Sequence, residues 1–106
     1  MIARLWHGST PVSRSKAYLD FLVKTGVPDY QKTTGNRGVQ ILLRKEEDVA
    51  HFLLISLWDS MEAVGRFAGP DVDRAKYYPE DPQFLLELKP NVVHYEMAYS
   101  VGSPTY

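Results

Sequence analysis

The hydrophobic pattern is most informative at residues 52–58, where apolar side chains follow one another with a single interruption at Ser56. An antiparallel strand is usually apolar on one face only, because its other face meets water. The continuous run therefore predicts a strand that is covered on both faces. Helices of the same chain can cover one face, and a second copy of the chain is the simplest cover for the other.

The residues after this strand predict two helices. Asp59, followed by Glu62 three positions later, forms a capping-box pattern that marks the start of a helix. Apolar residues then recur at helical spacing, and the Gly-Pro pair at residues 69–70 is a stop signal. Asp71 can cap a second, shorter helix, which we expect over residues 71–77.

An earlier helix is predicted over residues 13–25, with Thr10 or Ser13 as its cap. Gly26 is placed to end it, and Pro28 makes the stop firm. A polar stretch then reads as a loop up to residue 36.

Four segments carry the patterns of strands, namely residues 2–7, 38–44, 49–58 and 91–99. Together with the helices, they give the order strand, helix, strand, strand, helix pair, strand. Two split βαβ halves of this kind form the ferredoxin-like motif. We therefore predict an α+β, ferredoxin-like βαββαβ fold with a four-stranded antiparallel sheet, whose uncovered face packs on a second subunit to make a dimeric α+β barrel.

Composition limits the functional classes. The 106 residues predict one domain over residues 1–100 and a C-terminal tail over residues 101–106. Twelve basic against thirteen acidic side chains leave no positive surplus for a nucleic-acid partner. No cysteine is present, which excludes disulfides and thiolate chemistry. No signal peptide and no membrane-spanning apolar run is recognisable, so we expect a soluble, cytoplasmic protein without membrane partners.

The histidines are His7, His51 and His94, each on a different predicted strand. Their spacing is not that of metal ligands, so no metal site is predicted. His7 lies at the end of the first strand, where a pocket between sheet and helices would open, and an imidazole can deprotonate an acidic phenol. Arg4 shares a strand face with Trp6, opposite His7, and is interpreted as structural.

Two segments resemble the antibiotic-biosynthesis-monooxygenase-like family of dimeric α+β barrels, namely FLLISLWDSMEAVGRFAGPDV and VVHYEMAY. The resemblance covers nearly the whole chain. It implies a homodimer that forms through the sheet faces, with a pocket in each subunit between helices and sheet. Members of this family include cofactor-free oxygenases of aromatic polyketides, haem-degrading monooxygenases and many small proteins without an assigned role.

The haem-degrading members differ from this chain at three matched positions. Phe67 stands where they carry a tryptophan that ruffles the haem, and Tyr77 stands where they carry the axial histidine. Leu5 falls near their pocket asparagine. A tyrosine can ligate haem iron, so the departures disfavour haem degradation without removing haem as a ligand.

The resemblance and the residue types together give the predicted site. His7 is the predicted base, and Tyr77 orients the substrate. Phe67 forms a wall, and at most one of Tyr77 and Tyr78 is expected to face the pocket, with Tyr78 favoured for packing. Trp58 and Leu5 are the remaining candidates for ligand contact.

The predicted function is a cofactor-independent monooxygenase that acts on an aromatic or polyketide-like molecule. Two alternatives stay open, a non-enzymatic dimer that binds a small apolar or aromatic ligand and a haem-binding protein with a tyrosine ligand. The sequence does not identify a substrate.

Overall fold

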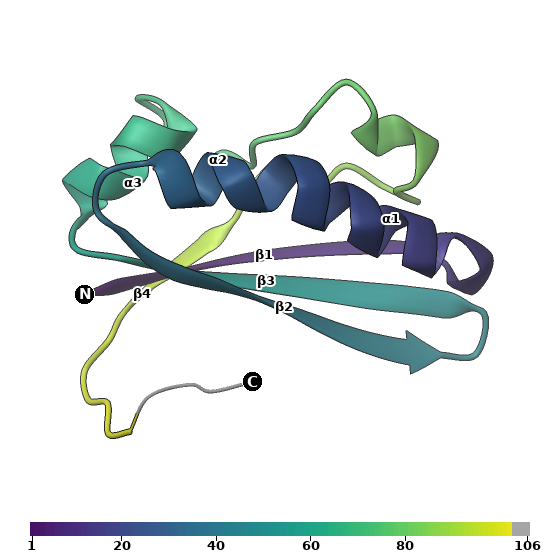
Figure 1. The fold of residues 1–106 in the computed structure, drawn as a ribbon, viewed down its shortest axis with the longest axis horizontal. Helices are drawn as coiled ribbons and strands as arrows, with labels where there is room; N and C mark the ends of the chain where they lie inside the picture. Colours follow the sequence, from purple (N-terminus) through teal and green to yellow (C-terminus); the bar gives the residue numbers. More distant parts are fainter. Residues whose placement is uncertain (103–106) are drawn as a thin grey trace.

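A computed structural model describes residues 1–102 of the chain, and residues 103–106 of the predicted tail lie outside this range. The strands are β1 (Ile2–Pro11), β2 (Asn36–Glu46), β3 (Val49–Trp58) and β4 (Val93–Glu96). They form one antiparallel sheet in the order β2-β3-β1-β4. The helices lie on one side of this sheet (Figure 1). The predicted α+β, ferredoxin-like fold is therefore confirmed.

The central strand β3 has the predicted bounds, and its helix-facing side is fully buried. Its alternate residues Ala50, Phe52, Leu54, Ser56 and Trp58 are buried under the helices. The intervening side chains point to the other face and are only partly covered in the single chain. Side chains of a strand alternate between faces, so the continuous apolar run serves two different surfaces.

The first helix is longer than predicted, because neither Gly26 nor Pro28 ends it. A short 3₁₀ turn, η1 (Val12–Arg14), leads into α1 (Ser15–Phe21), then a π-helical segment η2 (Leu22–Gly26), then α2 (Val27–Lys32). Figure 1 shows these segments as one continuous rod, called the long helix below.

The π-helical segment explains how Pro28 is accommodated. The N–H of Val27 bonds to the carbonyl of Leu22, five residues back. This wider turn restarts the helix immediately before Pro28, which then occupies the first turn of α2. A proline costs no hydrogen bond there, because the N–H groups of a first turn have no intrahelical partner.

The helix α3 (Met61–Ala68) forms as predicted but with a different cap. The Ser60 hydroxyl accepts from the N–H of Ala63, which is the capping bond that was expected of Asp59. Asp59 instead pairs with the guanidinium of Arg37 on β2, with 2.6 Å between Oδ1 and Nε. Gly69 ends the helix, as its place in the sequence predicted.

The second short helix predicted over residues 71–77 is absent. The backbone there runs beside a later segment, through a bridge between Arg74 and Asn91 and a hydrogen bond from Val92 N–H to the Asp73 carbonyl. The only helical turn in the described part of this region is η3 (Asp81–Gln83). The last strand is also shorter than predicted, because β4 comprises only Val93–Glu96.

The sheet face away from the helices remains uncovered in the single chain. We call it the open face, and its apolar side chains, grouped by cross-strand pairing, are Ala3, Leu5, Leu42, Leu53, Ile55, Leu57, Val93 and Tyr95. Val93 and Tyr95 are 53% and 58% exposed. Among residues 1–102, no helix is both long and apolar enough to cross a membrane.

Gly35, in the turn before β2, and Gly69, at the end of α3, provide a test of how closely the first of these turns packs on α3. Both have positive φ, 97° and 89°, but a Cβ at Gly35 would lie 2.5 Å from the Ala63 Cβ, whereas one at Gly69 would meet nothing within 4 Å. Gly69→Ala should cost about 1–3 kcal/mol through backbone strain alone, because its φ of 89° with ψ of −172° is a conformation essentially restricted to glycine. Gly35→Ala should cost about 1–3 kcal/mol more through overpacking. Urea unfolding of both variants measures the difference, and equal losses would contradict the close approach of Gly35 to Ala63.

Candidate functional site

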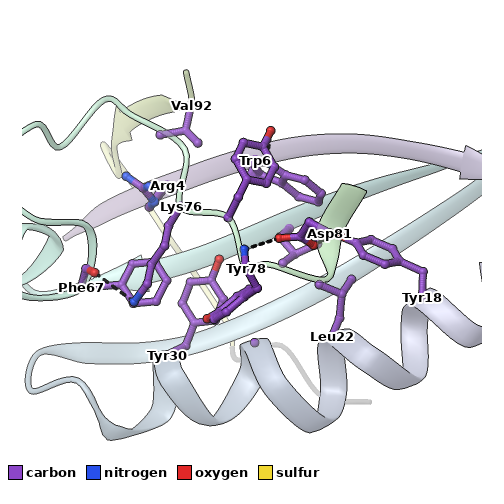
Figure 2. A pocket seen from close by; sticks show the side chains of 13 residues that line it. Arg4, Trp6, Tyr18, Leu22, Tyr30, Phe67, Lys76, Tyr78, Asp81 and Val92 are labelled. Carbon is purple, nitrogen blue, oxygen red and sulfur yellow. Dashed lines mark hydrogen bonds between the residues drawn. The ribbon is translucent and has the colours of Figure 1, made fainter. Parts of the chain in front are cut away.

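A small cavity lies between the helix-covered face of the sheet, the long helix and the segment at residues 76–92 (Figure 2). Its volume is about 30 Å³. This is room for one or two water molecules, whereas pockets for organic ligands are about 300–1,000 Å³. A ligand of aromatic size therefore requires the segment to move outward from the long helix.

Two cations occupy one end of this cavity, which we call the cationic end. The Arg4 guanidinium carbon lies 5.8 Å from the centroid of the Phe67 ring, and the Lys76 ammonium nitrogen lies 4.4 Å from it. Lys76 also donates to the Phe67 carbonyl at 3.3 Å. Figure 2 shows Arg4, Lys76 and Phe67 gathered on one side of the cavity.

Backbone carbonyls and a histidine hold Arg4. Its Nη1 donates to the Val72 carbonyl at 2.6 Å and lies 3.1 Å from Nε2 of His94, while Nη2 donates to the Arg74 carbonyl at 3.0 Å. Arg4 has no acceptor lone pair, so the Nε2 of His94 must accept and its proton must sit on Nδ1, 3.2 Å from Asp73 Oδ1. Burial, and then the charge of Arg4, lower the pKa of His94.

Aromatic rings form the walls. Phe67 stacks on Tyr30 with 4.4 Å between centroids and an interplanar angle of 18°. Trp6 meets Tyr77 edge to face, and its indole N–H donates to the Tyr77 hydroxyl at 3.3 Å. That hydroxyl donates in turn to the Lys89 carbonyl at 2.6 Å. The cavity is thus faced by rings whose polar tips are already hydrogen-bonded.

A buried carboxylate occupies the end opposite the two cations (Figure 2). Asp81 is 2% exposed and accepts from the Tyr18 hydroxyl at 3.1 Å and from the Tyr78 N–H at 2.6 Å. Burial raises the pKa of Asp81, and it raises that of Tyr18 as well. A carboxylate with a raised pKa in a cavity is a candidate proton acceptor.

A hydrogen bond between Tyr78 and the long helix holds the cavity closed. The Tyr78 hydroxyl donates to Asp29, which also pairs with Lys32 at 2.9 Å and Lys76 at 3.5 Å. The hydrogen bond from Tyr78, with those cations, lowers the pKa of Asp29 to about 2. Asp29 is therefore ionised at neutral pH and keeps the segment that carries Lys76 and Tyr78 on the helix.

The structure brings three of the six predicted site residues to the cavity. Phe67, Tyr77 and Tyr78 line it, so both tyrosines face it although at most one was expected to. Trp58 is fully buried behind Phe67, with 5.5 Å between ring centroids, and does not line the cavity. Its indole N–H donates instead to the Ser56 hydroxyl at 2.9 Å.

Leu5 and His7 lie on the open face, away from the cavity, which corrects the position expected for them. They pair across strands with Ile55 and Leu53, whose side chains also point away from the helices. The sequence correctly predicts that β1 alternates between two faces, but the pocket was expected on the face of Leu5 and His7 and lies on the face of Arg4 and Trp6. The long side chains of Arg4 and Trp6 are buried under the helices, so the alternation of β1 puts Leu5 and His7 on the other face.

On the open face, His7 belongs to a basic cluster. Its Nε2 lies 3.0 Å from Nδ1 of His51, and its Nδ1 lies 2.6 Å from the Lys89 ammonium nitrogen. Burial, and then the charge of Lys89, lower the pKa of His7. The described residues include no cluster of three or more metal-ligating side chains.

Sequence reasoning missed Arg4, Lys76 and Asp81 as cavity residues. The alternation that pairs Arg4 with Trp6 was the available signal for Arg4. Lys76 and Asp81 had no such signal, because their segment has almost no regular secondary structure and its path depends on side-chain contacts.

A second, shallow depression lies between the long helix and the edge strand β2. It has a volume of about 480 Å³ and is lined by residues such as Leu19, Val23, Val39 and Ile41, with no ionisable side chain. Its walls offer no group for acid–base or charge-stabilising chemistry. The small cavity is therefore the candidate functional site.

Comparison with solved structures finds the same fold over nearly the whole chain. A Bacillus cereus protein assigned as an antibiotic biosynthesis monooxygenase is 13% identical, with a TM-score of 0.67 over 96% of this chain and 97% of that one. A variant of MhuD, solved with two manganese protoporphyrin IX molecules per active site, is 15% identical, with a TM-score of 0.63 over 97% and 100% of the chains. No protein-family model and no curated protein matches the sequence. The resemblance to the monooxygenase-like family is thus confirmed at the level of fold.

The cavity residues do not fit a haem in this arrangement. Tyr77, the expected ligand, both accepts from Trp6 and donates to the Lys89 carbonyl. Burial raises the pKa of Tyr77, which disfavours the phenolate that would bind iron.

The lowered pKa values of His94 and His7 predict a loss of stability in mild acid. In the unfolded chain both histidines titrate near 6.5, whereas in the folded chain they titrate at lower pH. The unfolded state therefore binds more protons below pH 6.5, and the free energy of unfolding should fall as pH drops through this window. Urea unfolding at pH 7.5, 6.5 and 5.5 measures this slope. His94→Gln should flatten it, and an unchanged slope in that variant would contradict the assigned role of His94.

Proposed function

We propose that this protein binds a small aromatic molecule in the cavity between the long helix and the sheet and oxidises it as a monooxygenase, with molecular oxygen and no bound cofactor. The observation that carries the proposal is the separation of charge in this aromatic-walled cavity. Two cations lie at one end and a buried carboxylate lies at the other. The shared fold with an assigned antibiotic biosynthesis monooxygenase supports the reaction type.

The proposed chemistry starts with removal of a proton from an acidic phenol or enol. Arg4 and Lys76 stabilise the resulting oxyanion, because charge in a dry cavity is stabilised most by fixed opposite charge. An electron-rich anion can pass one electron to O₂. The two radicals then combine into a peroxide that loses water.

For an anthrone, the sum of these steps converts one CH₂ group and O₂ into a carbonyl group and H₂O. The substrate supplies both electrons that reduce the second oxygen atom, so no further reductant is needed. The protein contributes deprotonation, orientation and exclusion of water.

Asp81 is the proposed proton acceptor. It lines the cavity, and its raised pKa brings the basicity of its carboxylate closer to the working pH. His7 was the predicted base, but it lies on the opposite sheet face. Phe67 and Tyr77 keep their predicted roles as wall and orienting residue, because both line the cavity.

Substrate binding requires the cavity to open. The Tyr78–Asp29 hydrogen bond and the Lys76–Asp29 ion pair join the segment at residues 76–92 to the long helix. In the proposed cycle, these contacts break as the substrate enters and re-form to exclude water. A binding protein without turnover would use the same cavity, and oxygen uptake distinguishes the two functions.

We also propose that two copies of the chain pack through their open faces. The open face presents eight apolar side chains across all four strands, and in a single chain they stay partly or largely exposed. A contiguous apolar patch of this kind marks an interaction surface. The proposed dimer leaves the cavity on the outer, helix-covered side of each subunit.

The oxygenase proposal predicts oxygen uptake with an anthrone probe, measured with an oxygen electrode together with the absorbance of the anthraquinone product. Asp81→Asn should lower kcat by about 10²-fold or more, since general base catalysis contributes about 10²–10⁴-fold. Asp48→Asn, the same change at an exposed carboxylate in the turn between β2 and β3, is the matched control and should leave kcat unchanged. His7→Ala should also leave it unchanged. Anthrone binding without uptake would indicate a binding protein.

The dimer proposal predicts that a charge at the centre of the open face separates the subunits. Ile55→Lys should convert a particle of twice the chain mass into one of 12.1 kDa in sedimentation velocity. Leu86→Lys adds the same charge at an exposed apolar residue outside the sheet and should leave the dimer intact. Circular dichroism confirms that both variants fold, and a wild-type monomer would overturn the proposal.

A further inference from the structure

We propose that Arg4 is the receptor for an ionised oxygen of the ligand, so that the protein selects aromatic anions, carboxylates or phenolates, over their neutral counterparts. This inference rests on the proposed binding function and names the chemical class of ligand for the same cavity. It follows from an arginine that is buried without an anionic partner.

Arg4 is only 2% exposed. None of the ion pairs found among residues 1–102 involves it. Its partners are the carbonyls of Val72 and Arg74 and the Nε2 atom of His94, all of which are neutral groups. Buried charges in proteins are normally paired, because desolvation of an unpaired charge is costly. The positive charge of Arg4 therefore has no carboxylate in direct contact, and the nearest negative charge identified, Asp73, lies behind His94.

The donors left over on Arg4 are on the Nε and Nη2 nitrogens, which share one edge of the guanidinium. A guanidinium carries five N–H groups, and the three contacts described above use both of those on Nη1 and one on Nη2. The Nε–H and the second N–H of Nη2 remain. These two nitrogens form the pair that binds a carboxylate through two parallel hydrogen bonds.

The Nε atom also remains accessible. Every fully buried polar side-chain atom in the described part of the chain has a hydrogen-bond partner. The Nε of Arg4 has no such partner among these residues, so it must keep some accessible surface. Because Arg4 lines the cavity, the cavity is the place where a ligand oxygen can reach this edge.

The surroundings of Arg4 favour an anion that is attached to an aromatic ring. Lys76 brings a second positive charge to the same Phe67 ring, at 4.4 Å from its centroid. Asp29 partly balances Lys76 at 3.5 Å, whereas Asp81 lies at the far end of the cavity. Phe67 and Tyr30 provide the flat apolar surface beside the two cations.

His94 and Asp73 act as positioning residues for Arg4. The neutral His94 ring, oriented by Asp73, accepts from Nη1 and thereby leaves the Nε–Nη2 edge directed elsewhere. Val72, from the segment after α3, fixes Nη1 from a second direction. An arginine held by three fixed acceptors loses little further conformational freedom when it binds an anion, which favours affinity.

The test compares ligands that differ only in charge, by isothermal titration calorimetry at pH 8. The probes are 2-naphthoate against 2-naphthamide for the carboxylate arm, and 4-nitrophenolate against 4-nitroanisole for the phenolate arm. Wild-type protein should bind at least one anion about tenfold or more tightly than its neutral counterpart, as expected for a charge-assisted hydrogen bond. The arm that shows the preference identifies the ionised group.

Variants then assign the preference to Arg4. Arg4→Met should reduce it to about twofold or less, and Arg4→Lys should retain part of it, because the charge stays but the bidentate edge is lost. Arg37→Met removes an exposed arginine on β2 and should leave the preference unchanged. Circular dichroism establishes whether each variant folds. If Arg4→Met does not fold, the wild-type comparison of anion and neutral probes, together with the Arg4→Lys variant, tests the proposal.

The outcomes separate the two proposals. If wild-type protein binds the neutral probes as tightly as the anions, anion selection is overturned while the proposed binding function stands. If a folded Arg4→Met variant keeps the anion preference, Arg4 is not the receptor. If no probe of either charge binds, the proposed binding function fails together with this inference.

Discussion

The pairing of β1 with β3 is the constraint on which the rest of this structure depends. Ten residues of β1 face ten of β3 in an unbroken register from Ile2 opposite Trp58 to Pro11 opposite Val49. Strand alternation then leaves no choice of face, because a shift by one residue would exchange every side chain. Arg4 and Trp6 must lie under the helices, where they wall the cavity, and His7 must lie outside. Both the chemistry proposed for the cavity and the apolar surface proposed for dimerisation follow from this one register.

The parts of the fold that could be predicted are those fixed by local pattern. The double-sided apolarity of residues 49–58 gave β3 its bounds, and the stop at Gly69 gave the end of α3. The long helix was cut short because Gly26 and Pro28 are helix breakers in isolation. The π-helical hydrogen bond from Val27 to Leu22, which makes Pro28 acceptable, has no sequence signature of its own. Tertiary packing of the stripe Tyr18, Leu22, Gly26 and Tyr30 against the cavity overrides the local signals there.

The candidate site was predictable mainly at positions that match those of known family members. Phe67 on α3 and Tyr77 were expected at the pocket because they match positions of the haem-degrading family members, and both line the cavity. Lys76, Tyr78 and Asp81 come from a segment whose path is set by specific contacts, such as those of Asp81 with Tyr18 and of Tyr78 with Asp29. Such contacts join residues 63 and 49 positions apart in the chain, which no periodicity encodes. The same contacts leave a cavity of only about 30 Å³. The long-range contacts that could not be predicted from the sequence are therefore also the ones that limit access to the site.

The two faces of the sheet are connected through Lys89. Its carbonyl accepts the Tyr77 hydroxyl from the cavity side, at 2.6 Å, and its ammonium group lies 2.6 Å from His7 on the open face. A ligand that displaces Tyr77 would therefore disturb the residue that also contacts the basic cluster of His7 and His51. One residue of an otherwise irregular segment thus contacts both the wall of the cavity and the basic cluster on the open face.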